Sequence, residues 1–291
     1  MNLAIASDYC GSTGDPLPRL KAAAEAGFTH IHWCHQWCTD FIYTEPELKA
    51  IKKTMKECGL TLLDIHGSAG SEKAWYSKDE YRRQAGVLLV RNRMEMFAEL
   101  EGVGALMMHI PGMTCNYNYT DEERAVIRES IDQQRKSLDE LMPFAEKYHC
   151  PIAVENMPDD SFEVIGELMR DYPVELMGIT YDSGHGHIRT DKGLDHIEQY
   201  KDRLMALHLH DNDGTGDQHQ PPFYGTIDWA RLASILDSSA YDRPLSYEMT
   251  MTNTPFHDKE AKEQTPEAIA AFLKDAHERC TRFANMTTKF K

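Results

Sequence analysis

The chain has 291 residues, of which 41% are hydrophobic and 27% are charged, as in an ordinary globular protein. Its formal net charge of −16 repels polyanions, so a nucleic-acid partner is disfavoured. No apolar run approaches the ~20 residues needed to span a bilayer. The N-terminus has neither the basic region nor the long hydrophobic segment of a signal peptide. We therefore expect a cytoplasmic protein with no membrane partner.

The cysteines are odd in number and scattered, which favours free thiols over disulfides. They are Cys10, Cys34, Cys38, Cys58, Cys115, Cys150 and Cys280. Cys34 and Cys38 are four residues apart, a spacing compatible with metal binding. Because no second cysteine pair completes a thiolate site, ordinary packing is the better interpretation for both.

Short apolar runs alternate with longer amphipathic segments along the whole chain. The runs predict strands over residues 2–7, 30–34, 61–66, 105–110, 151–156, 178–182, 204–210 and 244–250. The segments that follow them predict helices over residues 18–26, 45–58, 79–101, 121–149, 162–171, a weaker helix ending near residue 200, and then 228–237 and 266–285. Gly27 and Gly59 stand where the first two helices should stop.

Strand–helix repeats without an intervening linker predict a parallel sheet covered by helices. Eight such units in about 250 residues match an α/β fold, the (β/α)8 TIM barrel. An open doubly wound sheet would call for a Gly-rich first turn, and the first turn here, SDYCGSTGDP, lacks the GxGxxG order. We therefore predict one TIM barrel domain over residues 1–291.

Polar side chains gather at the C-terminal ends of the predicted strands, where the active site of a barrel lies. They are His66, His109, Glu155, Asp182, His185, His208, His210, Asp217, His219 and Glu248. Taken singly, each has an ordinary explanation: a hydrogen-bonded core histidine, an ion-paired glutamate or a capping aspartate. Charged groups are rarely buried without partners, however, and every strand end from the third to the eighth supplies a ligand-type side chain. The set suits a divalent ion, with Mn²⁺, Co²⁺, Zn²⁺ and Mg²⁺ all compatible.

Five segments carry a resemblance to a known family. They are IAVEN, YDSGH, LHLHDND, DQHQPPFYGTIDW and SYEM. With them the chain resembles the xylose-isomerase-like barrel superfamily, which includes sugar isomerases, ketose 3-epimerases, inosose-processing enzymes and the endonuclease IV enzymes of DNA repair. The resemblance covers nearly the whole chain. It implies one divalent ion held by Glu155, Asp182, His208 and Glu248.

The same resemblance implies roles for the histidines near strands six and seven. The family pattern has its ligand histidine three residues before an acidic residue, which selects His208, ahead of Asp211, over His210. His185 matches a family histidine that contacts substrate in the epimerases and metal in the endonucleases.

The predicted function is that of a metal-dependent sugar isomerase or epimerase acting on a small carbohydrate. The enzyme would move a proton next to the carbonyl through a metal-stabilised enediolate. Glu155 and Glu248 would be the catalytic base and acid, and His109 and His185 would hold hydroxyls. The loop after strand seven is acidic and the loop after strand eight is not basic, which favours a neutral sugar over a sugar phosphate. Barrels of this kind often dimerise, so a homo-oligomer is expected.

Two departures from the ketose epimerases weaken assignment to that branch. The segment ENMPDDSF follows strand five, where the epimerases carry an acidic substrate contact in a different pattern. The acidic DNDGTGD follows strand seven, where they carry an arginine. A keto-sugar dehydratase or lyase on the same metal site is therefore an alternative.

An abasic-site phosphodiesterase resembling endonuclease IV, with up to three ions, is a further alternative. The counterparts of its extra ligands are His66, His109, His185, Asp217 and His219. The negative net charge, the scarcity of basic residues in the strand-end loops and the lack of a stretch that could wedge into a minor groove all weigh against it. A non-catalytic binding barrel is disfavoured by the number of acids and histidines.

Aromatic residues follow strand two. Trp33, His35 and Trp37 could provide a stacking wall for a pyranose or glycoside, because aromatic faces pack against apolar sugar faces. The alternative is that the two tryptophans pack a helix against the barrel rim.

Overall fold

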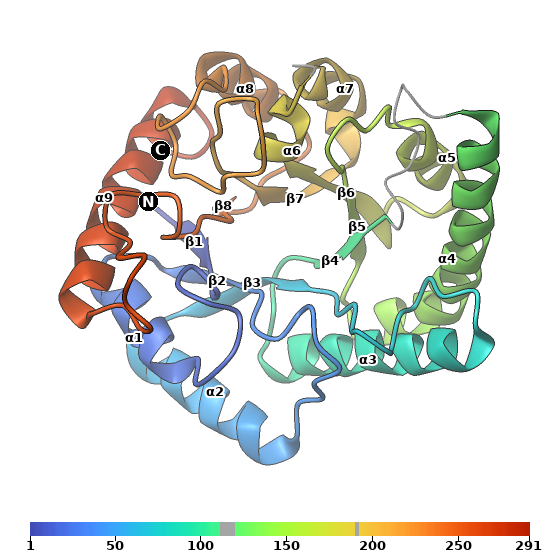
Figure 1. The fold of residues 1–291 in the computed structure, drawn as a ribbon, viewed down its shortest axis with the longest axis horizontal. Coiled ribbons are helices and arrows are strands. Elements are labelled where there is room, and N and C mark those ends of the chain that lie inside the picture. The colour runs from blue at the N-terminus through green and yellow to red at the C-terminus, as the bar shows by residue number, and fades with distance from the viewer. Residues whose placement is uncertain (111–119, 190–191) are drawn as a thin grey trace.

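Strands and helices alternate along the chain in a computed structural model that describes residues 1–110, 120–189 and 192–291. The strands are β1 (Leu3–Ala6), β2 (His30–Trp33), β3 (Thr61–His66), β4 (Leu106–His109), β5 (Ile152–Glu155), β6 (Met177–Asp182), β7 (Leu204–His208) and β8 (Leu245–Tyr247). The helices are α1 (Leu17–Glu25), α2 (Glu45–Cys58), α3 (Glu80–Glu99), α4 (Asp121–Lys147), α5 (Glu163–Asp171), α6 (Ser183–His187), α7 (Gly193–Tyr200), the 3-10 helix η1 (Lys201–Arg203), α8 (Trp229–Asp237) and α9 (Pro266–Met286). The long helices form an outer ring around the strands (Figure 1).

The strands form one parallel sheet that closes on itself. Its order is β7-β6-β5-β4-β3-β2-β1-β8. At the remaining edge the backbone N–H of Leu209 donates to Ser246 O at 3.0 Å, and the N–H of Glu248 donates to Leu209 O at 3.2 Å. These bonds join the chain just after β7 to the β8 segment, so the predicted TIM barrel is confirmed.

Side chains of different size line the two faces of the barrel wall. Large apolar residues such as Ile152 and Leu207 belong to the main core between strands and helices. Ala105, Ala153 and Ala206 form a small separate cluster, because successive strand residues face opposite sides of a sheet. Small side chains therefore fill the barrel interior at this level, and they leave room for a layer of larger polar groups at the C-terminal ends of the strands.

The structure differs from the predicted elements mainly after β6. One weak helix was expected there, and the structure has two, α6 and α7. Helix α6 begins directly at the strand end because the carboxylate of Asp182 accepts the backbone N–H of His185 at 2.7 Å and caps the helix. Strand β8 is also shorter than predicted.

The cysteines of the described segments are all free thiols, as expected, and they include the buried Cys34 and the exposed Cys38. Cys115 lies outside the described residues. Within those same segments, every helix is too short or too polar to cross a membrane.

Helix α3 lies so close to the chain segment after β3 that Gly86 has no room for a side chain. A Cβ there would lie 2.2 Å from the backbone N of Trp75 and 2.5 Å from the carbonyl carbon of Ala74. We expect Gly86→Ala to lower the free energy of unfolding by about 1–3 kcal/mol, because backbone atoms cannot turn away from the added methyl group. Urea unfolding measures the change. In the control Gly216→Ala nothing lies within 4 Å of the new Cβ, so a change below about 0.5 kcal/mol is expected; equal stability of both variants would contradict the close contact.

Candidate active site

Carboxylates and an imidazole converge at the C-terminal end of the barrel. Glu155, Asp182 and His208 are the last residues of β5, β6 and β7, and Glu248 directly follows β8. Their ligand-type atoms all lie within 4.8 Å of one another. His208 Nδ1 lies 3.0 Å from Glu155 Oε1 and 3.0 Å from Glu248 Oε2. The structure therefore brings together the four residues that the sequence places at successive strand ends.

Strand alternation sets the direction of these side chains. Glu155 lies two residues after Ala153, and His208 lies two residues after Ala206, so both continue the inward face of their strands. Glu155 is fully buried, and Glu248, with a side chain that is 12% exposed, is the member of the group nearest to solvent. The group is therefore reached from the mouth of the barrel.

Asp182 is held rigidly from three sides. The side chain of Asn156 accepts the backbone N–H of Asp182 at 2.8 Å and donates to its carbonyl at 3.0 Å. The Asp182 carboxylate caps α6 and also contacts His210 Nε2 at 3.0 Å. The carboxylate of Asp182 can therefore cap α6 and belong to the polar cluster at the same time.

Contacts within the cluster shift pKa values in opposite directions. Although burial opposes it, the carboxylates of Glu248 and Glu155 raise the pKa of His208 well above its ordinary value. Burial likewise opposes ionisation of the glutamates, yet His208 and His109 hold the pKa of Glu155 well below its usual range. His208 and His219 lower the pKa of Glu248 in the same way. Both glutamates are therefore ionised at neutral pH, and the excess negative charge suits a divalent cation.

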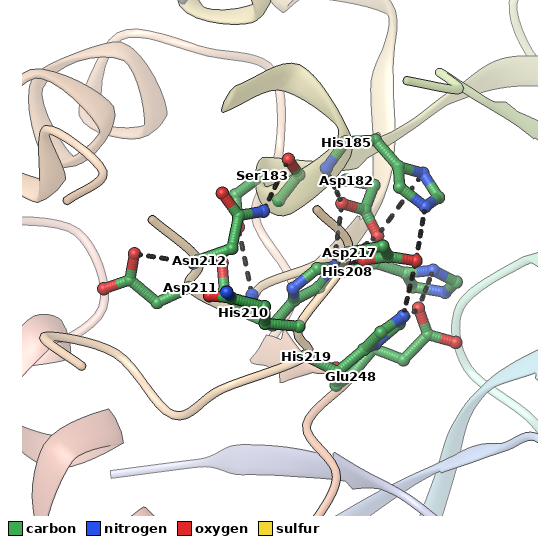
Figure 2. A network of polar contacts seen from close by, with 12 residues as sticks. Asp182, Ser183, His185, His208, His210, Asp211, Asn212, Asp217, His219 and Glu248 are labelled. Atoms are coloured by element: carbon green, nitrogen blue, oxygen red, sulfur yellow. Dashed lines mark hydrogen bonds and ion pairs between the residues drawn. The ribbon is translucent and has the colours of Figure 1, made fainter. Parts of the chain in front are cut away.

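A second group of predicted residues lies beside the first (Figure 2). Asp217 Oδ2 lies 3.3 Å from His185 Nε2 and 3.0 Å from His219 Nε2. The ring of His219 stacks on that of His210 with centroids 4.1 Å apart, and His219 Nδ1 is hydrogen-bonded to the Glu248 carbonyl at 2.9 Å. Burial tends to lower the pKa of His219, but the hydrogen bond to Asp217 outweighs this effect and raises the pKa to about 10. The polar side chains of the loop after β7 thus contact helix α6 and the residue that follows β8.

The ends of β3 and β4 bring two more predicted histidines to the cluster. His109 Nε2 lies 3.1 Å from Glu155 Oε2, and ligand-type atoms of His66, His109 and Glu155 lie within 4.8 Å of one another. His66 Nδ1 is hydrogen-bonded to the carbonyl of Gly67 at 2.8 Å. Burial and the neighbouring His109 lower the pKa of His66 to about 3, so its imidazole is neutral.

The sequence offered two interpretations of the aromatic residues near the end of β2, a stacking surface for a sugar and packing within the protein, and these residues differ in which one they fit. Trp33 is fully buried, and its indole N–H donates to the Tyr43 hydroxyl at 3.0 Å. His35 is enclosed between the same hydroxyl, at 2.6 Å, and the carbonyl of Gly14, at 2.7 Å. Trp37 instead stacks on His66 with centroids 4.4 Å apart. Trp33 is buried and bonded to Tyr43 and so presents no exposed face to a sugar, whereas Trp37 borders the polar cluster through His66 and His109.

Polar residues at the ends of β1 and β2 also belong to this region, although the sequence analysis assigned them no role in it. Burial and the charge of Glu248 raise the pKa of Asp8 to about 6. His32 is fully buried, and its ring lies 4.4 Å from that of His208. Cys34 Sγ lies 3.8 Å from Glu248 Oε1. The alternation of His32 and Cys34 on one face of the second strand is the signal that could have identified them.

Comparison with known proteins places the chain in a family. A family model described as a xylose isomerase-like TIM barrel matches residues 20–276. The chain belongs to this family. One relative, the uncharacterized protein y4fM of Sinorhizobium fredii, is 26% identical over 254 residues, which cover 80% of each chain.

Solved structures share the xylose isomerase-like barrel. A D-psicose 3-epimerase from Clostridium cellulolyticum H10, solved with D-tagatose, matches with a TM-score of 0.74 at 14% identity and covers 97% of this chain and 99% of its own. The IOLI protein, solved with a bound zinc atom, matches with a TM-score of 0.67 at 18% identity and covers 100% of this chain and 99% of its own. At these identities the likeness shows a common fold.

The β7 loop of this xylose isomerase-like barrel is anchored by Asp211. Its buried carboxylate accepts the backbone N–H groups of Asn212, Phe223 and Ile227 at 2.9, 2.8 and 3.2 Å, and the indole N–H of Trp229 at 2.8 Å. The backbone of Asp211 also pairs with that of Gln220, at N–O distances of 2.7 and 3.0 Å. The loop segment that carries Asp217 and His219 is thus fixed at both of its ends.

Removing the Asp211 charge should loosen this loop. We expect Asp211→Asn to lower the free energy of unfolding by about 2–3 kcal/mol, because a buried carboxylate that accepts several N–H groups becomes a neutral amide with one acceptor. Urea unfolding measures the loss, and limited proteolysis should cut within residues 212–220. Asp213→Asn is the control, because Asp213 is exposed, accepts hydrogen bonds from Thr215 within the same loop and lies outside the buried anchor. Similar losses in the two variants would contradict the anchoring role.

Proposed function

We propose that the protein is a divalent-metal-dependent sugar isomerase or epimerase that moves a proton next to a carbonyl. The observation that carries the proposal is the convergence of Glu155, Asp182, His208 and Glu248 within 4.8 Å at the mouth of the barrel. The family membership supports the same conclusion.

The residues of the cluster fit a divalent ion. Carboxylate oxygens and an imidazole nitrogen are ligands that Mn²⁺, Co²⁺, Zn²⁺ and Mg²⁺ accept, with little in the donor set to choose among them. His208 Nε2 is buried and has no hydrogen-bond partner in the structure. Glu155, Asp182, His208 and Glu248 would hold the ion, which would supply Lewis-acid polarisation of a substrate carbonyl.

Two carboxylates are arranged to handle the proton. Glu155 and Glu248 approach the same atom, His208 Nδ1, from different strands, each at 3.0 Å. Both have pKa values below the usual range, so either carboxylate can act as the base that removes the proton. The other must first take up a proton from solvent, which it can then deliver to the opposite face of the carbon. His109 and His185, which contact Glu155 at 3.1 and 3.5 Å, can hold substrate hydroxyls.

The surroundings of the cluster favour a neutral sugar. Asp8, Asp182 and Asp217 add negative charge to that of the two glutamates, and this charge would repel a phosphate group. The indole of Trp37 offers an aromatic surface beside His66 on which the apolar face of a sugar ring can pack. We therefore propose an uncharged ketose or keto-sugar as the substrate class.

Proton exchange with solvent tests this proposal. Mn²⁺-loaded protein incubated in D₂O with a panel of neutral ketoses and keto-sugars should incorporate deuterium beside the carbonyl of at least one of them, measured by mass spectrometry and NMR. Glu155→Gln and Glu248→Gln should each slow the exchange by at least about 10²-fold, whereas Asp213→Asn should leave it unchanged because Asp213 lies outside the cluster. An absence of exchange across the panel would contradict the proposal. Loss of water from the sugar in the same assay would instead identify a dehydratase or lyase.

A phosphodiesterase with several ions is a second candidate, and the arrangement of Asp217 favours it. This carboxylate lies between His185 and His219, while His66, His109 and Glu155 form a further group of ligand-type atoms. Both groups adjoin the first cluster and could extend it to three ions. The net charge of −16 weighs against binding to DNA.

The number of bound ions separates the two candidates. The sugar enzyme should retain one tightly bound Mn²⁺ per chain after dialysis, and Asp217→Asn should not change this number, since Asp217 lies outside the four-residue group. Elemental analysis of the dialysed protein measures the count. Three ions in the wild type, fewer in Asp217→Asn, together with cleavage of an abasic DNA duplex, would overturn the sugar assignment.

A further inference from the structure

Two donor side chains that the proposed reaction does not use, His32 and Cys34, lie on the β1–β2 side of the barrel beside Glu248. His32 and Cys34 are two residues apart at the end of β2, so their side chains extend from one face of the strand. Both are buried. One ring nitrogen of His32, Cys34 Sγ and one carboxylate oxygen of Glu248 lie within 4.8 Å of one another.

His32 has no polar partner although it is fully buried. Neither Nδ1 nor Nε2 forms a hydrogen bond. A buried polar group without a partner costs on the order of 1–3 kcal/mol. An aromatic contact with His208, at a centroid distance of 4.4 Å, leaves the ring nitrogens unsatisfied. An imidazole whose nitrogens have no hydrogen-bond partner can act as a ligand for a cation.

Glu248 faces two groups at once. Its Oε2 lies 3.0 Å from His208 Nδ1 in the four-residue cluster, whereas its Oε1 lies 3.8 Å from Cys34 Sγ. At a tetrahedral zinc ion with bonds of about 2.3 Å to sulfur and 2.0 Å to oxygen, these two ligands stand about 3.5 Å apart. The observed separation is close to that value, so the carboxylate can serve both groups of donors.

We propose that His32 and Cys34, together with Glu248 shared from the four-residue cluster, form a second binding site for one thiophilic divalent cation, Zn²⁺ or Cd²⁺. A nitrogen, a sulfur and an oxygen donor supply three of the four ligands of a tetrahedral site. Thiolate ligands select such ions over Mn²⁺ and Mg²⁺, which prefer oxygen. The site therefore distinguishes soft ions from hard ones, and it is independent of whether the protein isomerises a sugar.

The thiol must lose its proton for this site to form. Without a cation, the thiol of Cys34 can donate to Glu248 Oε1, 3.8 Å away. Binding of the ion releases that proton as the Cys34 sulfur–metal bond forms. The competing explanation is a simple S–H···O hydrogen bond, with His32 as a packing residue.

Cadmium titration separates the two explanations. The exposed thiol is first removed by Cys38→Ser, and the protein is titrated with Cd²⁺ while the ultraviolet thiolate-to-cadmium charge-transfer band is recorded. We expect the band to saturate at one equivalent. Adding Cys34→Ser should abolish it and lower the bound Cd²⁺ by one per chain. Adding Cys280→Ser, at another buried thiol, should preserve both. No band in the parent, or a band that survives Cys34→Ser, would overturn the proposal.

A measurement on the wild-type protein tests the site even if the variants fail to fold. Wild-type crystals soaked in Cd²⁺ should give an anomalous difference peak bounded by His32, Cys34 and Glu248, and its absence from that position would overturn the site. Mn²⁺ binding is followed in parallel. If Mn²⁺ fails to bind while the cadmium band appears, the proposal of a sugar enzyme is overturned and that of the thiophilic site is supported. If Mn²⁺ binds and the cadmium band is absent, the thiophilic site is overturned and the sugar enzyme is not.

Discussion

Repulsion among three carboxylates in the barrel interior is the constraint on which the surrounding structure depends. Glu155, Asp182 and Glu248 have ligand atoms within 4.8 Å of one another and of His208. Two like charges about 4 Å apart repel by roughly 4 kcal/mol at an effective dielectric constant of 20. In the chain alone, a proton on His208 offsets part of this repulsion, which is why the pKa of His208 is raised. A divalent ion in the same place would offset it with twice the charge.

The rest of the chain holds this unfavourable charge in place. Small residues such as Ala153 and Ala206 free the space below the cluster, and Asn156 fixes the backbone of Asp182. On the other side, the buried carboxylate of Asp211 ties down the loop after β7. Preorganisation of this kind is what a metal site requires, because the cost of gathering the ligands is met by folding rather than by binding.

The fold and most of the cluster could be predicted from sequence because both follow from strand periodicity. Each parallel strand ends at the same edge of the barrel, so a polar residue after an apolar run is already assigned to that edge. The orientation of Trp33 could not be predicted in this way, since it depends on a hydrogen bond to Tyr43, ten residues further along a loop. His32 was given no role because HIHWC is read as an ordinary strand, and Cys34 was considered only with Cys38. The proximity of both to Glu248, more than two hundred residues away, could not be predicted from the sequence.

Shared carboxylates explain how one polar layer can serve different chemistries. Glu155 presents Oε1 to His208 and Oε2 to His109, and Glu248 presents one oxygen to His208 and the other to Cys34. Each glutamate can therefore bind one ion and bridge to a neighbouring position. If both proposed positions bind metal, which of them fills would depend on the ion as much as on the protein, because hard ions favour carboxylate oxygens and thiophilic ions also accept the sulfur. Metal identity is thus a variable that any assay of this barrel must hold constant.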